Sequence, residues 1–226
     1  MDKLITTFLE FNNIREIVES LSINRSSNSN LKNKQMHTFL RNRIRKGDVL
    51  VAGPQRKPSS RTVTAYYTAS KGMFGENNVH VDMYSGKGKL VTVDERGVVN
   101  RSLRNLSNKR NHVTILRPTS LSAKERNKVV KHAQAQIGKS FNKKLLGGAL
   151  IKEISPKLPT GPFKEMDNAF TCSGLLAQSL DKGGVKVAPD KARSFVAPKD
   201  FRRSPDLKQV MVFDRDSKTN RWKVTR

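Results

Sequence analysis

The chain contains a single cysteine, Cys172, whose neighbours are those of a reactive thiol. The segment Thr-Cys-Ser-Gly-Leu-Leu around it begins a run of apolar residues at helical spacing, which predicts a helix over 172–180 with Cys172 in its first turn. Free N–H groups and the helix dipole stabilise negative charge there, which lowers the pKa of a thiol and raises the fraction of thiolate. The same N–H groups can stabilise the oxyanion that forms when a carbonyl is attacked. Cys172 is therefore the candidate nucleophile.

A thiol nucleophile needs a base, which is normally histidine. The chain has four histidines, and all of them precede Cys172 in the sequence: His37, His80, His112 and His132. An enzyme that carries the histidine after the cysteine, as papain does, is therefore excluded. His132 falls in a charged helix, His37 in a basic N-terminal segment, and His112 at a junction between a loop and a strand.

His80 is the candidate base because of its place on a predicted strand over 79–84. The valines and the methionine of this strand share one face, while His80, Asp82 and Tyr84 share the other. A histidine on the polar face of a strand is able to exchange protons near neutral pH. We therefore expect His80 to serve Cys172.

A third residue that orients the imidazole is expected on the next strand, 90–94, which follows a Gly-Lys-Gly turn and completes a hairpin. The register follows from two apolar pairs that would share one face, Val81 with Val93 and Met83 with Val91. This register sets Asp94 opposite His80 and puts Thr92 on the neighbouring diagonal. Either side chain could accept the imidazole N–H, although a carboxylate would do so more strongly.

The elements that must position these residues alternate between strands and helices. A turn that leads into an apolar strand is predicted at 46–51, further strands at 62–68, 113–116 and 209–213, and a further helix at 122–137. Ser122 and Glu125 form a capping box at the start of that helix. The irregular stretch 139–168 separates it from the cysteine helix. This mixture predicts an α+β domain.

The first part of the chain differs from the rest. Residues 3–21 have the apolar spacing of an amphipathic helix, 26–30 form a polar linker, and the basic segment 31–45 is compatible with a second helix. We expect residues 1–45 to be a helical extension with a linker that packs on the domain or on a partner, and 46–226 to be the domain itself.

Composition restricts the partners and the chemistry. The 226 residues include 44 basic and 19 acidic ones, a net charge of +25 that favours an anionic polymer such as nucleic acid or a bacterial cell wall. One cysteine excludes an intramolecular disulfide and a Cys-rich zinc site, and we expect no cofactor and no metal ion. No apolar run is long enough for a membrane helix, and the N-terminus has no secretory signal, so we expect cytoplasmic synthesis.

The cysteine segment, Phe-Thr-Cys172-Ser-Gly-Leu-Leu followed by Gly183-Gly184-Val185, resembles the nucleophile segment of NlpC-type cell-wall peptidases. The histidine-first order is similar to their permuted branch, which also includes lecithin retinol acyltransferase-like proteins. Four further segments are similar to that branch and occur in the same order. They are 46–50, 80–84, 135–141 and 197–201.

The resemblance implies a circularly permuted papain-like α+β fold, in which a small antiparallel sheet packs on the helix that bears Cys172. It also implies a cysteine peptidase or amidase, with peptidoglycan stem peptides as the substrate. In members of that branch the position of Thr92 usually holds His or Glu, so this chain departs from the pattern at the third catalytic position. The candidate catalytic set is Cys172 and His80, with Asp94 or Thr92.

Two other functions stay open at this point. The same permuted branch supports acyl transfer or deacylation on a lipid, which would require an apolar patch near Cys172. A basic structural protein of a virion that retains the fold is the non-enzymatic alternative. For a hydrolase without a secretory signal, packaging in a phage particle or release at lysis would bring it to the cell wall.

Overall fold

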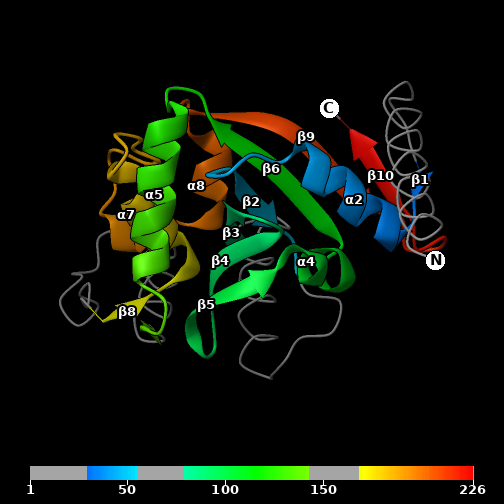
Figure 1. Ribbon diagram of the computed structural model, residues 1–226, viewed down its shortest axis with the longest axis horizontal. Helices are drawn as coiled ribbons and strands as arrows, with labels where there is room; N and C mark the ends of the chain where they lie inside the picture. Colours follow the sequence, from blue (N-terminus) through cyan, green and yellow to red (C-terminus); the bar gives the residue numbers. More distant parts are fainter. Residues whose placement is uncertain (1–29, 55–78, 143–167, 226) are drawn as a thin grey trace, which may run out of the picture.

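Eight strands form one antiparallel sheet in the computed structural model of the protein, which describes residues 30–54, 79–142 and 168–225 (Figure 1). The strand order is β1-β10-β9-β6-β2-β3-β4-β5. The strands are β1 (Asn30–Leu31), β2 (Val49–Ala52), β3 (His80–Gly86), β4 (Lys89–Asp94), β5 (Gly97–Ser102), β6 (His112–Pro118), β9 (Leu207–Arg215) and β10 (Trp222–Thr225). A separate parallel pair joins β7 (Ser140–Phe141) to β8 (Ala169–Phe170).

Helices cover both faces of the sheet, which confirms the predicted α+β class. They are α2 (Asn33–Arg43), α4 (Leu103–Lys109), α5 (Ala123–Ala135), α7 (Cys172–Asp181) and α8 (Pro198–Arg203), with a 3₁₀ turn η1 (Arg193–Phe195). Buried residues of α5, α7 and α8 join one apolar cluster, and those of α2 and α4 join the other. In Figure 1, α5, α7 and α8 lie together on one side of the sheet.

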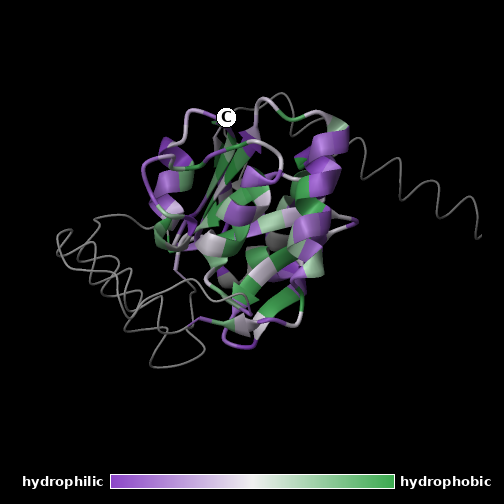
Figure 2. Ribbon diagram, turned by 90° about the vertical axis from the view of Figure 1, so that its left-hand side faces the viewer, coloured by the Kyte–Doolittle hydropathy of each residue, from purple (hydrophilic) through white to green (hydrophobic). Residues whose placement is uncertain are grey.

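Strand β2 lies in the middle of the sheet and is buried on both faces. Val49 and Val51 belong to the cluster beneath α5 and α7, whereas Leu50 and Ala52 belong to the cluster beneath α2. A strand covered on both sides has no solvent face, which is why its sequence is a continuous apolar run without alternation. Figure 2 shows hydrophobic residues concentrated in the strands and hydrophilic ones on the outer parts of the helices.

The hairpin of β3 and β4 positions the candidate base. Met83 pairs with Val91, as the apolar pattern predicts. The turn between the strands has three consecutive residues with positive φ, at 97° for Gly86, 52° for Lys87 and 68° for Gly88. Glycine adopts this conformation without a steric penalty, so the Gly-Lys-Gly sequence determines where β3 ends and β4 begins.

Helix α7 begins at Cys172 because Thr171 caps it. The Thr171 hydroxyl accepts a hydrogen bond from the backbone N–H of Gly174 at 3.0 Å, and Thr171 has extended backbone angles. At the other end, a Cβ atom on Gly183 would lie 2.6 Å from a methyl group of Val129 on α5. A glycine is therefore required where the end of α7 meets α5.

Helix α5 confirms the predicted capping box. The backbone N–H of Ser122 donates to the carboxylate of Glu125 at 2.7 Å, and the N–H of Glu125 donates to the Ser122 hydroxyl at 3.3 Å. Buried Val129, Val130 and Ala133 face the sheet. The helix also packs against α7 in the same apolar cluster.

Residues 30–45 belong to the domain core, which differs from the predicted boundary at residue 46. Strand β1 pairs with β10, and α2 buries Met36, Phe39 and Leu40 in the cluster that contains Trp222. The apolar residues of this segment are few among many basic ones, so its sequence alone resembles a solvated extension. The predicted helix 3–21, linker residues 26–29, strand 62–68 and residues 143–167 of the irregular stretch lie outside the described residues.

Within the described ranges, none of the helices is both long enough and apolar enough to cross a lipid bilayer.

Candidate active site

Cys172 is the first residue of α7, and its side chain is partly exposed. The first hydrogen bond of the helix runs from the N–H of Leu175 to the carbonyl of Thr171 at 3.1 Å. The N–H groups of Cys172 and Ser173 precede it, so they have no acceptor inside the helix. The thiol therefore lies at a helix N-terminus, as the sequence predicts.

His80 is the first residue of β3, and the structure brings it to the thiol. Cys172 packs against the cluster that contains Val81, and the His80 side chain is near enough to lower the pKa of its thiol. The Nε2 atom of His80 lies 2.8 Å from the hydroxyl of Thr92 and 3.0 Å from a carboxylate oxygen of Asp82. Because Nε2 already has these two partners, Nδ1 is the ring nitrogen that is left to exchange a proton.

The electrostatics of this pair favour a thiolate and an imidazolium. Burial would lower the pKa of His80, but the negative charges of Asp82 and Cys172 raise it to about 9. Burial would raise the pKa of Cys172, but the positive charge of His80 and two hydrogen bonds lower it overall. A thiol with a lowered pKa beside an imidazolium is a nucleophile at neutral pH.

Asp82 is the carboxylate that contacts His80, although the hairpin register pointed to Asp94 for this position. It is 4% exposed, and it lies two residues from His80 on the same strand. Burial would raise its pKa, but the adjacent His80, the more distant Arg110 and a hydrogen bond from Thr92 hold the pKa below its ordinary value. The signal was present in the sequence, because residues i and i+2 of a strand share a face.

Thr92 joins the other two polar side chains of this face. It is 1% exposed and contacts both His80 and Asp82. A hydroxyl can donate one hydrogen bond while it accepts another, so Thr92 can accept from the imidazole N–H and donate to the carboxylate. The predicted neighbour on the diagonal is therefore in contact with His80.

Asp94 does not contact His80, which corrects the prediction that it would orient the ring. Its carboxylate binds the guanidinium groups of Arg101 and Arg96, and it also accepts from the Arg96 N–H at 2.8 Å. Two guanidinium groups attract the carboxylate towards β5 and the turn that follows β4. The expected register of the hairpin holds at Met83 and Val91, but register alone does not determine where a charged side chain points.

Arg110, which follows α4, adds a buried positive charge near the site. It is 6% exposed, and its Nη1 atom donates to the carbonyl of Gly53 at 2.8 Å. Its charge acts on both His80 and Asp82. No motif in the sequence marks this arginine among the 44 basic residues of the chain.

The other histidines have partners elsewhere. His112 contacts Asp214 at 2.6 Å and Thr114 at 3.0 Å, and His132 contacts the hydroxyl of Ser179 at 3.1 Å. Burial and the nearby charges of Arg104 and Arg41 lower the pKa of His37. Of the four histidines, His80 is thus the one placed against the thiol.

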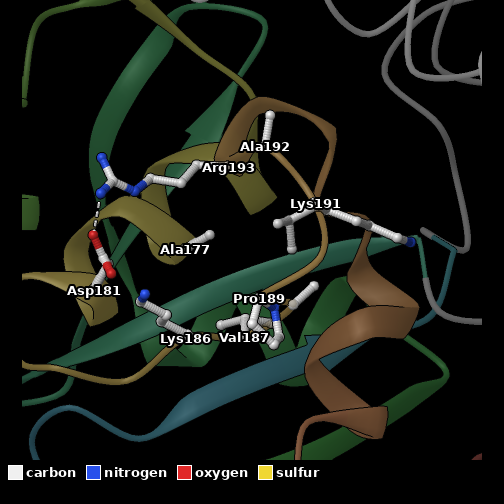
Figure 3. Close-up of a pocket in the computed structure, with 10 residues that line it drawn as sticks. Ala177, Asp181, Lys186, Val187, Pro189, Lys191, Ala192 and Arg193 are labelled. Carbon is white, nitrogen blue, oxygen red and sulfur yellow. Dashed lines mark hydrogen bonds and ion pairs between the residues drawn. The ribbon is translucent and has the colours of Figure 1, made fainter.

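A pocket of about 330 Å³ lies beside the second half of α7 (Figure 3). Its ten lining residues include neither Cys172 nor His80. Arg193 in its wall is paired with Asp181, while Lys191 extends away from the other labelled residues and pairs with Asp200 at 2.9 Å. The pocket is therefore separate from the thiol. Among the described residues, no three histidine, cysteine or acidic side chains converge as they would around a metal ion.

Comparison of the sequence with models of known protein families and with curated proteins finds no match.

Proposed function

We propose that this protein is a cysteine hydrolase that cleaves an amide or peptide bond with Cys172 as the nucleophile and His80 as its acid–base partner. The observation that carries the proposal is the position of a partly exposed thiol at a helix N-terminus, where its pKa is lowered by a histidine whose Nε2 lies against Asp82 and Thr92. Such a cysteine has both a means of ionisation and a base held in one orientation.

The reaction follows from these groups. The Cys172 thiolate attacks the carbonyl carbon and forms a C–S bond, while the carbonyl oxygen becomes an oxyanion near the N–H groups that begin α7. The oxyanion collapses, the C–N bond breaks, and the His80 imidazolium gives its proton to the leaving amine. Water then attacks the thioester carbonyl while neutral His80 takes one of its protons, and the C–S bond breaks to release the Cys172 thiolate. The carboxylic acid product loses its proton to solvent, and the thiolate–imidazolium pair is restored.

The fold supports the permuted papain-like interpretation in its coarse features. The histidine strand β3 precedes the cysteine helix α7 in the chain, and the two elements pack against each other in an antiparallel sheet layered with helices. We extend the proposal to peptidoglycan stem peptides as the substrate. The net charge of +25 favours the anionic cell wall as the place of action, with a phage particle as the carrier.

The lipid alternative requires an apolar surface near the thiol. Among the described residues, Ile137 is the large apolar side chain that is exposed, at 40%. It follows α5, and it is a single residue, whereas an acyl chain requires a continuous apolar surface. We therefore treat lipid acyl transfer as an outcome of the test and argue for amide hydrolysis.

The test is incubation of the purified protein with peptidoglycan and with isolated stem peptides, followed by mass spectrometry of the released fragments. We expect new amine and carboxylate termini from the wild type, and none from Cys172→Ala or His80→Gln. His112→Gln is the matched control, because His112 also contacts an aspartate and a threonine but lies away from the thiol. Acyl transfer between phospholipids without peptide cleavage would support the lipid function. No thiol-dependent turnover of either substrate would favour the structural protein.

A further inference from the structure

The pocket beside the second half of α7 is a cavity that the proposed hydrolysis does not use (Figure 3). Its volume of about 330 Å³ lies within the range of about 300–1,000 Å³ that is usual for small-molecule sites. Small apolar side chains make up most of its wall, and they are Ala177, Val187, Ala188, Pro189, Ala192 and Val196. Such a wall suits a small aliphatic group.

The pocket and the thiol lie on different faces of α7. At about 3.6 residues per turn, Ala177 is rotated about 140° from Cys172 around the helix axis, and Asp181 is rotated about 180°. At about 1.5 Å per residue, these two residues also lie about 8 and 14 Å further along the axis than Cys172. A ligand in the pocket would therefore not be the amide that the thiol attacks.

Hydrogen bonds fix the loop that forms the outer wall of the pocket. The N–H of Lys191 donates to the carbonyl of Ala188 at 3.1 Å. The carboxylate of Asp200, which is 6% exposed, accepts from the Lys191 amine at 2.9 Å and from the N–H of Ala197 at 2.8 Å. A wall that is already ordered loses little conformational entropy when the pocket is filled.

One cation in the wall of the pocket is left without a carboxylate. Of the three cationic side chains that line it, Arg193 pairs with Asp181. Lys191 pairs with Asp200 and extends away from the other labelled residues in Figure 3. The third cation, Lys186, has no hydrogen bond or ion pair among the described residues. Three cations against two carboxylates leave one positive charge, which is complementary to a monoanion.

We propose that this pocket is a binding site for a small aliphatic carboxylate, whose charged group binds the Lys186 amine while its aliphatic part contacts the apolar wall. Few polar groups in an otherwise apolar pocket are typical of sites for small molecules. A phosphate dianion would require a second cation without a carboxylate. Asp190 belongs to the same loop, but it is exposed and does not line the pocket.

The experiment is an NMR titration of the full chain, isotope-labelled at its amide nitrogens, with N-acetyl-L-alanine. We expect saturable shifts of the backbone amides of Ala177, Val187 and Ala192, with a dissociation constant in the millimolar range that is usual for so few atoms. The uncharged N-acetyl-L-alanine amide has nearly the same shape, and it should bind about three- to tenfold more weakly. Absence of saturable shifts, or equal binding of the acid and the amide, would overturn the proposal.

Lys186→Ala should weaken the binding of N-acetyl-L-alanine by about three- to tenfold, whereas Lys186→Arg should keep most of it. The matched control is Lys182→Ala, which removes an exposed lysine that follows α7 and does not line the pocket. Equal weakening in Lys182→Ala and Lys186→Ala would mean that general surface charge attracts the acid, and the pocket would lose its assignment.

Two further variants test the cavity itself. Ala177→Met adds volume from the helix, and Ala192→Phe adds volume from the loop, so each should reduce the binding of N-acetyl-L-alanine at least about fivefold. Both should keep the wild-type rate of iodoacetamide reaction at Cys172, which verifies that α7 is intact. Binding at wild-type strength in both variants would overturn the proposal.

The readout needs no turnover, so it is independent of the proposed hydrolysis. Binding of the acid without peptide cleavage would leave the pocket assigned and remove the hydrolase function. Peptide cleavage without binding of the acid would remove the pocket assignment alone.

Discussion

The hydroxyl of Thr92 lies 2.8 Å from Nε2 of His80 and bridges from one strand of a hairpin to the other. A carboxylate oxygen of Asp82 lies 3.0 Å from the same ring nitrogen, and Thr92 helps to lower the pKa of Asp82. Asp82 contacts the ring from the strand that carries His80, and Thr92 contacts it from the neighbouring strand. Because Thr92 on β4 contacts the ring of His80 on β3, the orientation of the ring depends on both strands of the hairpin.

We predict that Thr92→Val lowers kcat/KM by about ten- to a hundredfold, which corresponds to loss of about 1.5–3 kcal/mol from hydrogen bonds to charged groups. Valine has nearly the shape of threonine, so the buried space stays filled. Thr92→Ser keeps the hydroxyl and is expected to retain most of the activity. Equal loss in both variants would mean that the methyl group, and not the hydroxyl, is what matters.

Asp82→Asn is expected to lower the pKa of His80 from about 9, because the negative charge nearest to the ring is removed. The alkaline limb of the pH–rate profile, where the imidazolium acid is lost, should move to lower pH, and turnover should fall. Asp94→Asn serves as the matched control, because Asp94 binds Arg96 and Arg101. A profile that shifts in Asp94→Asn but not in Asp82→Asn would contradict this assignment.

Cys172 should react with iodoacetamide at pH 6 much faster than free cysteine does. The lowered pKa of Cys172 leaves a larger thiolate fraction at this pH than the ordinary value permits. His80→Gln removes the main positive charge and should slow the reaction to the rate of an ordinary thiol. The measurement is the rate of mass increase at Cys172, with His112→Gln as the control that should react like the wild type.

Stability should depend on pH through the same histidine. The pKa of His80 is raised from 6.5 to about 9 by the folded environment, so its contribution is fully present below pH 6.5 and is lost as the pH rises through about 9. Urea unfolding across this range should show a decrease in the free energy of unfolding towards high pH. The decrease should be smaller in His80→Gln, and identical pH slopes in the two proteins would exclude His80 as its source.

Gly183→Ala should destabilise the fold by about 1–3 kcal/mol, the usual cost of overpacking. The added methyl group would lie 2.6 Å from Val129, so either α5 or the end of α7 must shift. Val129→Ala removes the clashing methyl groups and should be less costly in the Gly183→Ala background than in the wild type. Additive effects in a double-mutant cycle of thermal unfolding would show that the two residues do not meet.

The sequence predicts the central part of the site because local patterns specify it. The hairpin register at Met83 and Val91, the capping box of α5 and the start of α7 at Cys172 all follow from neighbouring residues. Each depends on turn chemistry, capping or periodicity within a few positions. These are the features that short segments of sequence determine physically.

The remaining part depends on contacts between distant segments. Arg110 reaches the site by binding Gly53, and no local pattern connects those two residues. Asp94 was predicted from its register position, but two nearby guanidinium groups bind its carboxylate. Strand β5 and helix α4 were not predicted, because Gly97–Ser102 has a single buried apolar side chain, Val98, and Leu103–Lys109 is short.

The pairing of β1 with β10 has a consequence for how the chain folds during synthesis. Leu31 pairs with Trp222, so the cluster under α2 gains its largest buried side chain only after residue 222 has left the ribosome. Strand β6 likewise cannot complete its hydrogen bonds on one edge until its neighbour β9 has been synthesised. Such distant pairings form late and slowly. A nascent chain that contains His80 and Cys172 but not yet β9 and β10 would thus lack a finished sheet on which to hold them, and a reactive thiol would arise only after these two strands have been synthesised.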